Sequence, residues 1–377
     1  MVRVLAARIR RATAFGRLGE MEHERARRGR GAAANPTGRF ERLSYEPAID
    51  LRTAGPDEDD TPALKTEFYR DPAREILAHN ESPDVGFETS VNPYRGCEHG
   101  CIYCYARPTH EYLGLSAGLD FESRIFVKED APQLLRRELS KPSWRPRVIA
   151  FSGVTDPYQP AERRLCLTRR CLEVMAAFSN PVVIVTKSHL VTRDLDLLRD
   201  LAGVGAALVL ISVTTLDAEL ARRLEPRASR PDRRLDAIRT LAAAGVPVGV
   251  LIAPVIPGLN DSEISAIVAA AAEAGAGSAG YVMLRLPHGL KQLFADWLAQ
   301  HYPGRRDKVL HRIQEVRAGR LNDPRFGSRM TGEGVYARQI EAMFGVALRR
   351  AGIERRSWEL STRAFRRPGG AQLDLFA

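Results

Sequence analysis

The stretch Asn92-Pro-Tyr-Arg-Gly-Cys97-Glu-His-Gly-Cys101-Ile-Tyr-Cys104-Tyr105 places three of the five cysteines of this 377-residue chain within eight residues. Three thiolates in a C-x3-C-x2-C spacing converge on one inorganic centre if the loop turns sharply, and Gly96 and Gly100 allow such a turn. The spacing therefore predicts a metal centre with Cys97, Cys101 and Cys104 as ligands. A four-iron cluster fits best, because three cysteines leave one iron open for a cofactor or substrate.

Two other interpretations of this stretch stay open from the residues alone. A structural zinc site closes with four ligands, often as two C-x2-C pairs; no second pair exists here, but His99 or His110 would complete a set. The cysteines would otherwise be buried without metal. We do not expect a disulfide framework, because the cysteine number is odd, the chain is long and no secretory apolar segment comes first.

From residue 89 onward, short apolar runs typical of strands alternate with amphipathic helical patterns. Six strands are expected at 89–94, 148–153, 182–186, 207–214, 246–253 and 280–286. Helices are expected at 162–178, 194–201, 217–224, 232–244 and 261–274, with another beginning near Pro108. Repeated βα units with right-handed crossovers give parallel strands, so we expect an α/β fold, either a partial (β/α)6 barrel or an open sheet. Functional side chains then lie beyond the carboxyl ends of the strands.

The pattern Cys97-x3-Cys101-x-Tyr103-Cys104 resembles the signature of the radical S-adenosylmethionine (SAM) superfamily. Two further stretches, Gly29-Arg-Gly-Ala-x-x-Asn35-Pro-x-Gly-Arg-Phe40 and Thr155-Asp-Pro-Tyr-Gln-Pro160, resemble a bacterial branch related to spore photoproduct lyase, a DNA-repair radical enzyme. The resemblance covers roughly residues 29–348. It implies a TIM-type (β/α)6 barrel and a [4Fe-4S] cluster whose open iron chelates SAM. The implied chemistry is reductive cleavage of SAM to methionine and a 5′-deoxyadenosyl radical.

One position departs from the lyase pattern. The resemblance implies a hydrogen-donor cysteine at the end of the second strand, where this chain reads Phe151-Ser-Gly153-Val-Thr-Asp156. Cys166 and Cys171 come later, within a predicted helix, and five residues apart they point in different directions. We expect both to be buried small apolar residues. Reversal of a thymine dimer is therefore not predicted, whereas a nucleic-acid substrate stays open.

Catalytic candidates follow from the predicted strand ends. Prolines stiffen the loop Thr155–Pro160, so Asp156 and Tyr158 are expected to be held over the barrel mouth. Tyr103, just before the last cysteine of the motif, is expected to pack on the cofactor or to relay a radical. A turn cap for Asp156 and a packing role for Tyr103 are the alternatives.

The expected cofactor-binding residues lie at later strand ends. The lyase resemblance implies SAM contacts from a Lys and a Ser at the third and fourth strand ends, here Lys187 and Ser212, with the lysine pairing with the SAM carboxylate. Thr214 on the fourth strand and Arg227, an anion-binding candidate, complete the set. Capping of the following helices is the alternative role for Lys187 and Ser212.

Positive charge is concentrated towards the two ends of the chain, which carries a formal net charge of +10. Residues 1–40 hold ten Arg against three Glu, and residues 349–367 hold seven Arg against two Glu. Such segments favour a polyanionic partner, although an Arg-rich composition throughout explains them equally well. The predicted organisation is a low-order leader at 1–62, a radical SAM core at 63–288, a helical region closing the barrel at 289–348, and a basic tail at 349–377.

The tail contains Gln372-Leu-Asp-Leu-Phe376, which resembles the pentapeptide that bacterial polymerases and repair proteins use to bind the replication sliding clamp. The segment Gln372, Leu373, Asp374, Leu375 and Phe376 is expected to bind as a unit. The Gln372 amide would hydrogen-bond the rim of a pocket, and the two leucines and Phe376 would insert into an apolar groove. Burial of this tail on the barrel is the alternative.

Together these patterns predict a cytoplasmic radical SAM enzyme that acts on nucleic acid in DNA repair or modification and needs an external electron donor. No apolar run is long enough to span a membrane. The alternatives are a cluster- or zinc-stabilised module that binds the clamp or DNA without radical catalysis, and a radical SAM enzyme acting on tRNA or a peptide.

Overall fold

The computed structural model of the 377-residue chain describes residues 27, 29–40, 64–353 and 359–368. The clamp-type pentapeptide and most of the leader predicted at 1–62 lie outside the described residues. No helix in the described part of the chain is long and apolar enough to cross a bilayer.

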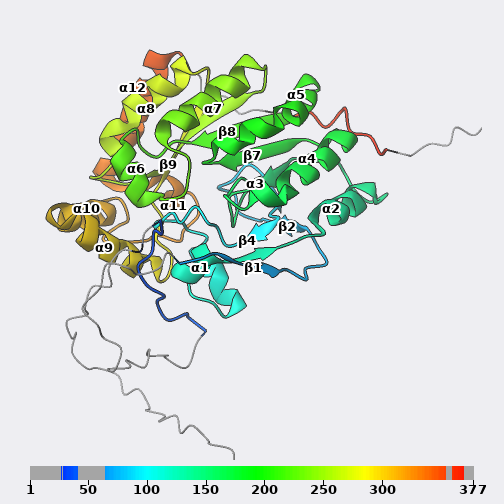
Figure 1. The fold of residues 1–377 in the computed structure, drawn as a ribbon. Coiled ribbons are helices and arrows are strands. Elements are labelled where there is room, and N and C mark those ends of the chain that lie inside the picture. Colours follow the sequence, from blue (N-terminus) through cyan, green and yellow to red (C-terminus); the bar gives the residue numbers. More distant parts are fainter. Residues whose placement is uncertain (1–26, 28, 41–63, 354–358, 369–377) are drawn as a thin grey trace, which may run out of the picture.

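A seven-stranded sheet in the order β10–β9–β8–β7–β6–β3–β2 forms the centre of the molecule (Figure 1). Six of its strands are parallel, and β2 (Leu77–His79) joins β3 antiparallel. The parallel strands are β3 (Thr89–Val91), β6 (Ile149–Phe151), β7 (Val182–Thr186), β8 (Ala207–Ser212), β9 (Val248–Val255) and β10 (Ser278–Met283). The predicted α/β class with six parallel strands is confirmed. Within the described residues β10 and β2 form opposite edges, so the barrel is not closed by strand pairing.

Both faces of the sheet are buried, as the apolar strand sequences require. In β7, Val182 and Ile184 pack with the outer helices, while Val183 lies with Ala150 and Leu208 in a separate apolar cluster. Helices cover the outer face (Figure 1). They are α2 (Ala131–Ser140), α4 (Leu167–Phe178), α5 (Leu195–Gly203), α7 (Pro231–Ala243) and α8 (Ile264–Glu273). In contrast, α6 (Ala218–Leu224) packs with Ile102 and Tyr103 of the cysteine stretch.

The single helix predicted at 162–178 is wrong, because the chain breaks at Cys166. There α3 (Glu162–Leu165) ends and α4 begins, with Cys166 in a left-handed conformation at φ 52°. The carboxylate of Glu162 accepts the backbone N–H of Thr168 at 3.0 Å, so this side chain caps the second helix. Cys171 is fully buried as expected, whereas Cys166 at the break is partly exposed.

A small second sheet carries the beginning of the cysteine stretch. Its order is β1 (Glu67–Arg70), β5 (Arg124–Val127) and β4 (Tyr94–Arg95), with α1 (Leu119–Ser123) directly before β5. The strand expected at 89–94 is therefore split: its first half is β3 of the large sheet, and its end pairs with β5. Pro93 lies at the division, where it has no N–H to donate to a ladder.

The C-terminal region is helical, with α9 (Leu290–His301), α10 (Arg306–Glu315), α11 (Ser328–Thr331) and α12 (Gly334–Ala351). α12 packs on α8, and α11 packs on the edge strand β10. From α11, Arg329 binds Asp84 and Ser82 in the loop between β2 and β3. These contacts join the two edges of the large sheet across the gap left by strand pairing.

Candidate functional site

The three motif cysteines lie together in one tightly folded loop. Gly96 and Gly100 have φ values of 81° and 67°, which turn the chain before Cys97 and before Cys101. Cys97 packs against Phe121, Cys101 packs in a neighbouring apolar cluster, and Cys104 contacts both groups. Burial raises the pKa of the Cys101 thiol, and the nearby Cys104 and Cys97 thiols raise it further. The loop therefore presents three thiols to one small volume.

The donor set fits a cluster better than a single ion. In the described part of the chain, no three or more His, Cys, Asp and Glu side chains are placed to hold one metal ion. A four-iron cluster takes one thiolate on each of three irons, so its ligands surround a larger group. Three thiols therefore match the ligand number that such a cluster takes, and His99, the fourth ligand of the zinc alternative, faces Asp156 at 3.3 Å.

A buried ion pair between Arg107 and Glu122 supports the cysteine loop. Arg107 is fully buried and donates to the backbone carbonyls of Cys101 (2.9 Å) and Gly100 (3.2 Å). The same guanidinium binds the carboxylate of Glu122, which is also fully buried. The Cys101 carbonyl also accepts the backbone N–H of Cys104 within the loop (3.2 Å), so Arg107 adds a second donor there and supplies a donor to the Gly100 carbonyl.

Residues 29–40, part of the segment predicted as a low-order leader, lie against this loop. The backbone N–H groups of Gly31 and Ala32 donate to the Glu122 carboxylate at 2.9 and 2.8 Å. A Cβ on Gly31 would lie 1.8 Å from the carbonyl oxygen of Gly100, so only glycine fits there. The segment is thus packed on the cysteine loop, backbone against backbone.

The loop after β6 holds the cysteine loop from the other side. Thr155 donates through its hydroxyl to the Gly96 carbonyl (2.8 Å), and Gln159 donates to the same oxygen (3.1 Å). Asp156 faces His99 at 3.3 Å and accepts the backbone N–H of Lys187 (2.8 Å). Asp156 therefore joins the cysteine loop to the end of β7, and it also accepts the Tyr158 backbone N–H (2.9 Å), the turn cap given as its alternative role.

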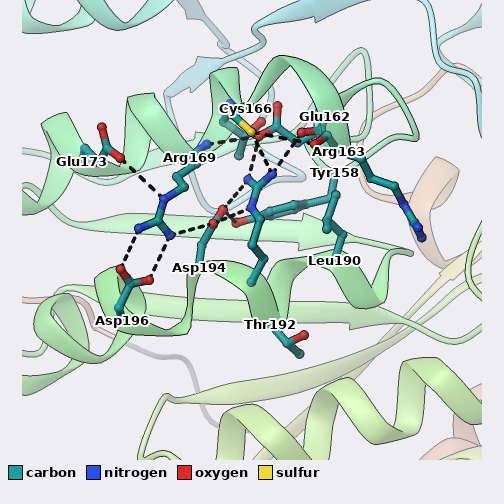
Figure 2. A network of polar contacts seen from close by, with 12 residues as sticks. Tyr158, Glu162, Arg163, Cys166, Arg169, Glu173, Leu190, Thr192, Asp194 and Asp196 are labelled. Carbon is teal, nitrogen blue, oxygen red and sulfur yellow. Dashed lines mark hydrogen bonds and ion pairs between the residues drawn. The ribbon is translucent and has the colours of Figure 1, made fainter.

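Tyr158 points away from the cysteines. Its ring is buried and its hydroxyl donates to Asp194 at 3.0 Å, within an ionic network that also holds Arg169 and Glu162 (Figure 2). The carboxylate of Asp194 in turn binds Arg169 at 3.1 Å. The geometry favours a supporting role for Tyr158 in fixing the loop after β6.

Tyr103 is tied to residues that follow β8. Its hydroxyl donates to Glu225, which also accepts from Thr214 (2.7 Å) and binds Arg234. All four side chains are buried. Burial opposes ionisation of Glu225, but Arg234 and Lys187 lower its pKa to about 2. Tyr103 and Thr214 are thus brought together, and their hydroxyls anchor the cysteine loop to the sheet.

The other predicted cofactor residues occupy different positions. Lys187 lies inside the site: its ammonium is 5.8 Å from the centre of the Tyr103 ring, and it lowers the pKa of Cys101 and Cys104 against the larger effect of burial. Ser212 is buried at the end of β8, where its carbonyl accepts from Arg234. Arg227 pairs with Glu98 at 3.0 Å. Lys187 is the best placed of the three to meet a ligand on the cysteine loop.

The family model of the radical SAM superfamily matches residues 91–271, the part that carries the cysteine loop and the strand ends around it. The chain belongs to the radical SAM superfamily. It is therefore a radical SAM enzyme, and its reaction is not given by family membership. Membership of this family implies a [4Fe-4S] cluster and SAM as cofactors.

Two relatives align over much of the radical SAM core. Rv2578c of Mycobacterium tuberculosis is 40% identical over 231 residues, which cover 60% of this chain and 68% of that protein. MJ0683 of Methanocaldococcus jannaschii is 30% identical over 199 residues, which cover 53% of this chain and 71% of that protein. Among solved structures, spore photoproduct lyase superposes with a TM-score of 0.53 and 17% identity, covering 75% of this chain and 78% of the lyase. The lyase shares the fold.

Sequence reasoning missed the residues that support the loop. Arg107, Glu122 and Glu225 are buried charged side chains, which are rare without a partner. A signal was present for Arg107, which lies three residues after the last motif cysteine, and for Glu225 beside the singled-out Arg227. Nothing local marks Glu122, because its partners at Gly31 and Ala32 are 90 or more residues away.

Proposed function

We propose that this radical SAM enzyme acts on nucleic acid, in DNA repair or modification. The observation that carries the proposal is the shared architecture with spore photoproduct lyase, which has been solved with bound AdoMet and dinucleoside spore photoproduct. The net charge of +10 supports a polyanionic substrate. A radical SAM enzyme acting on tRNA or a peptide is the alternative that the experiments below must separate.

In this proposal Cys97, Cys101 and Cys104 hold a [4Fe-4S] cluster, and Lys187 binds the carboxylate of SAM. When bound, the cluster supplies the electron that cleaves SAM to methionine and a 5′-deoxyadenosyl radical, which abstracts a substrate hydrogen. Arg107 and Gln159 fix the turns of the cysteine loop, and the buried Tyr103 hydroxyl anchors it to Glu225. Asp156 keeps His99 against the end of β7. The chain's own residues thus orient the cofactor and substrate.

The reaction differs from one that uses a cysteine at the end of β6. That strand ends at Phe151, and no thiol follows before Cys166. Cys166 contacts Arg193 at 3.6 Å in the network around Asp194, and Cys171 is buried in the core between sheet and helices. Neither thiol faces the motif cysteines, so the proposal does not include thymine-dimer reversal through a donor cysteine.

The proposal also includes a sliding clamp as partner and an external electron donor. The clamp is supported by Gln372-Leu-Asp-Leu-Phe376, which lies outside the described residues. The last described segment, 359–368, runs along the amino-terminal side of the sheet: Ser361 donates to Gly205 (2.8 Å) before β8, and Arg366 donates to Phe178 (2.9 Å) before β7. The cysteine loop lies at the carboxyl ends of these strands. The described part of the tail thus ends on the side of the sheet opposite to the cysteine loop.

The test is anaerobic purification followed by iron analysis, Mössbauer spectroscopy and an assay of 5′-deoxyadenosine from SAM. We expect a four-iron cluster and SAM cleavage after reduction, both lost in Cys97→Ala and kept in Cys166→Ala, the matched control away from the loop. Adding single-stranded DNA, tRNA or a peptide then separates the substrate classes. Stimulation by DNA supports the proposal, whereas stimulation by tRNA or the peptide alone would overturn its nucleic-acid repair assignment.

A further inference from the structure

Arg285 lies at the edge of the site and pairs with no acidic side chain of the described residues. It follows β10, so it lies at the carboxyl ends of the strands with the cysteine loop. Within the described residues no carboxylate lies within 4.0 Å of its guanidinium, and its hydrogen bond is to the Met330 sulfur at 3.9 Å. A partly buried guanidinium with five donors and one weak acceptor is poorly satisfied, so it is suited to an external anion.

The ring of Tyr105 lies beside this guanidinium. The Arg285 carbon is 5.1 Å from the ring centre, and the Tyr105 hydroxyl donates to the Gly153 carbonyl (2.7 Å) at the end of β6. Half of the Tyr105 surface is exposed, although it directly follows Cys104. Tyr105 thus reaches from the end of β6 towards Arg285 after β10, with about half of its surface exposed.

Further exposed aromatic rings, each with an arginine against it, lie on both sides of the pair formed by Tyr105 and Arg285. Three residues beyond Arg285, His288 contacts Arg39, whose guanidinium lies 5.1 Å from the Phe40 ring and 5.7 Å from the Tyr112 ring. Both rings are more than half exposed.

On the other side Arg329 covers the exposed ring of Phe326 at 4.4 Å. We name Arg39, Phe40, Tyr105, Tyr112, Arg285 and Phe326 the arginine–aromatic strip. Arg39 and Arg329 are neutralised by Glu111 and Asp84, so Arg285 carries the unpaired charge of the strip.

The charges near Arg285 distinguish a substrate site from the cofactor site. Burial and the neighbouring Arg329 lower the pKa of Arg285, opposed by Tyr105 and Asp84. Lys187 lies over the Tyr103 ring inside the cysteine loop (5.8 Å), whereas Arg285 contacts Tyr105 and Met330 beyond the last motif cysteine. The two cations therefore lie at different places in the site.

We propose that Arg285 binds a backbone phosphate of single-stranded nucleic acid and that Tyr105 stacks an adjacent unpaired base at the mouth of the site. This inference rests on the proposed nucleic-acid substrate. Exposed aromatic rings can stack on bases of any sequence, and a neighbouring guanidinium can bind the backbone phosphate. Phe40 and Tyr112 on one side and Phe326 on the other extend the platform to further bases.

The test is fluorescence anisotropy of the anaerobically purified holoenzyme with a labelled mixed-sequence single-stranded oligodeoxynucleotide across a series of salt concentrations. Arg285→Gln should bind about tenfold more weakly, and its slope of log affinity against log salt should fall by about one. Arg285→Lys should keep the slope, because the charge remains. Arg199→Gln, which removes an exposed arginine of α5, is the matched control and should behave as wild type.

Stacking gives a separate readout. Tyr105→Leu should bind at least about fivefold more weakly with an unchanged salt slope, because it removes a ring and no charge. Iron content is measured for each variant, since Tyr105 follows a cluster ligand. The inference is overturned if Arg285→Gln and Arg199→Gln show equal affinity and slope, or if Arg285→Gln loses affinity for SAM and not for the oligonucleotide. Absence of oligonucleotide binding by wild type would instead overturn the proposed function.

Discussion

The guanidinium of Arg107 and the carboxylate of Glu122 form a fully buried ion pair under the cysteine loop. Arg107 donates hydrogen bonds to the carbonyls of Gly100 and Cys101, while Glu122 accepts hydrogen bonds from the N–H groups of Gly31 and Ala32. One pair therefore connects the loop that carries the ligands with a segment that precedes it by about 70 residues in sequence. The position of the thiols depends on contacts that the C-x3-C-x2-C motif itself does not contain.

Glu122→Gln should strongly destabilise the protein. The change leaves the Arg107 charge buried without its partner, which typically costs about 3 to 5 kcal/mol. The measurement is the urea midpoint of anaerobically purified protein, followed by circular dichroism. The matched control is Glu219→Gln, which breaks exposed pairs with Arg222 and Arg223 and should leave the midpoint nearly unchanged. Equal midpoints for the two variants would contradict the importance of the buried pair.

Gly31→Ala should separate the N-terminal segment from the cysteine loop. A Cβ there would lie 1.8 Å from the Gly100 carbonyl oxygen, so one of the two backbones must move. Overpacking of this kind typically costs about 1 to 3 kcal/mol. We expect faster proteolytic cleavage between residues 29 and 40 and reduced iron content. Gly86→Ala, which meets no atom within 4 Å, is the control; similar cleavage of both variants would refute the close packing.

The sheet could be predicted from local patterns, whereas the side chains that support the cysteine loop could not. The strand predicted at 182–186 coincides with β7, because a β-branched apolar run between helical patterns is readable within a few residues. The partners of Glu122 and the pairing of Tyr103 with Glu225 connect residues 90 to 122 positions apart. The break at Cys166 was missed because the Glu162 carboxylate that caps α4 also fits a helical charge pattern.

Glu225 should make acid stability depend on its ionised form. Burial opposes that form, but Arg234 and Lys187 lower the pKa from 4.5 to about 2. Because the folded pKa lies below the unfolded one, the stabilisation is complete above about pH 4.5 and is lost as pH falls towards 2.

Unfolding midpoints of wild type and Glu225→Gln, measured from pH 7 to pH 3, test this dependence on Glu225. Wild type should be the more stable at pH 7, and the difference should shrink in acid. Glu273→Gln, an exposed change at the end of α8, should follow wild type throughout. Parallel curves for wild type and Glu225→Gln would show that the carboxylate does not carry the effect.

Lys187→Met should weaken the binding of SAM. Asp156 holds the Lys187 backbone N–H at 2.8 Å, which places the side chain over Tyr103 and beside the thiols. Methionine keeps a chain of similar length and removes the charge, so a carboxylate of SAM loses a charge-assisted contact worth about 1.5 to 3 kcal/mol, or roughly 10- to 150-fold in affinity. Equilibrium dialysis of anaerobic holoenzyme with labelled SAM measures this change, with Lys308→Met on the exposed face of α10 as control. If Lys187→Met retains its iron and binds SAM as tightly as the control, the carboxylate is held by another residue, and the assignment of Lys187 is wrong.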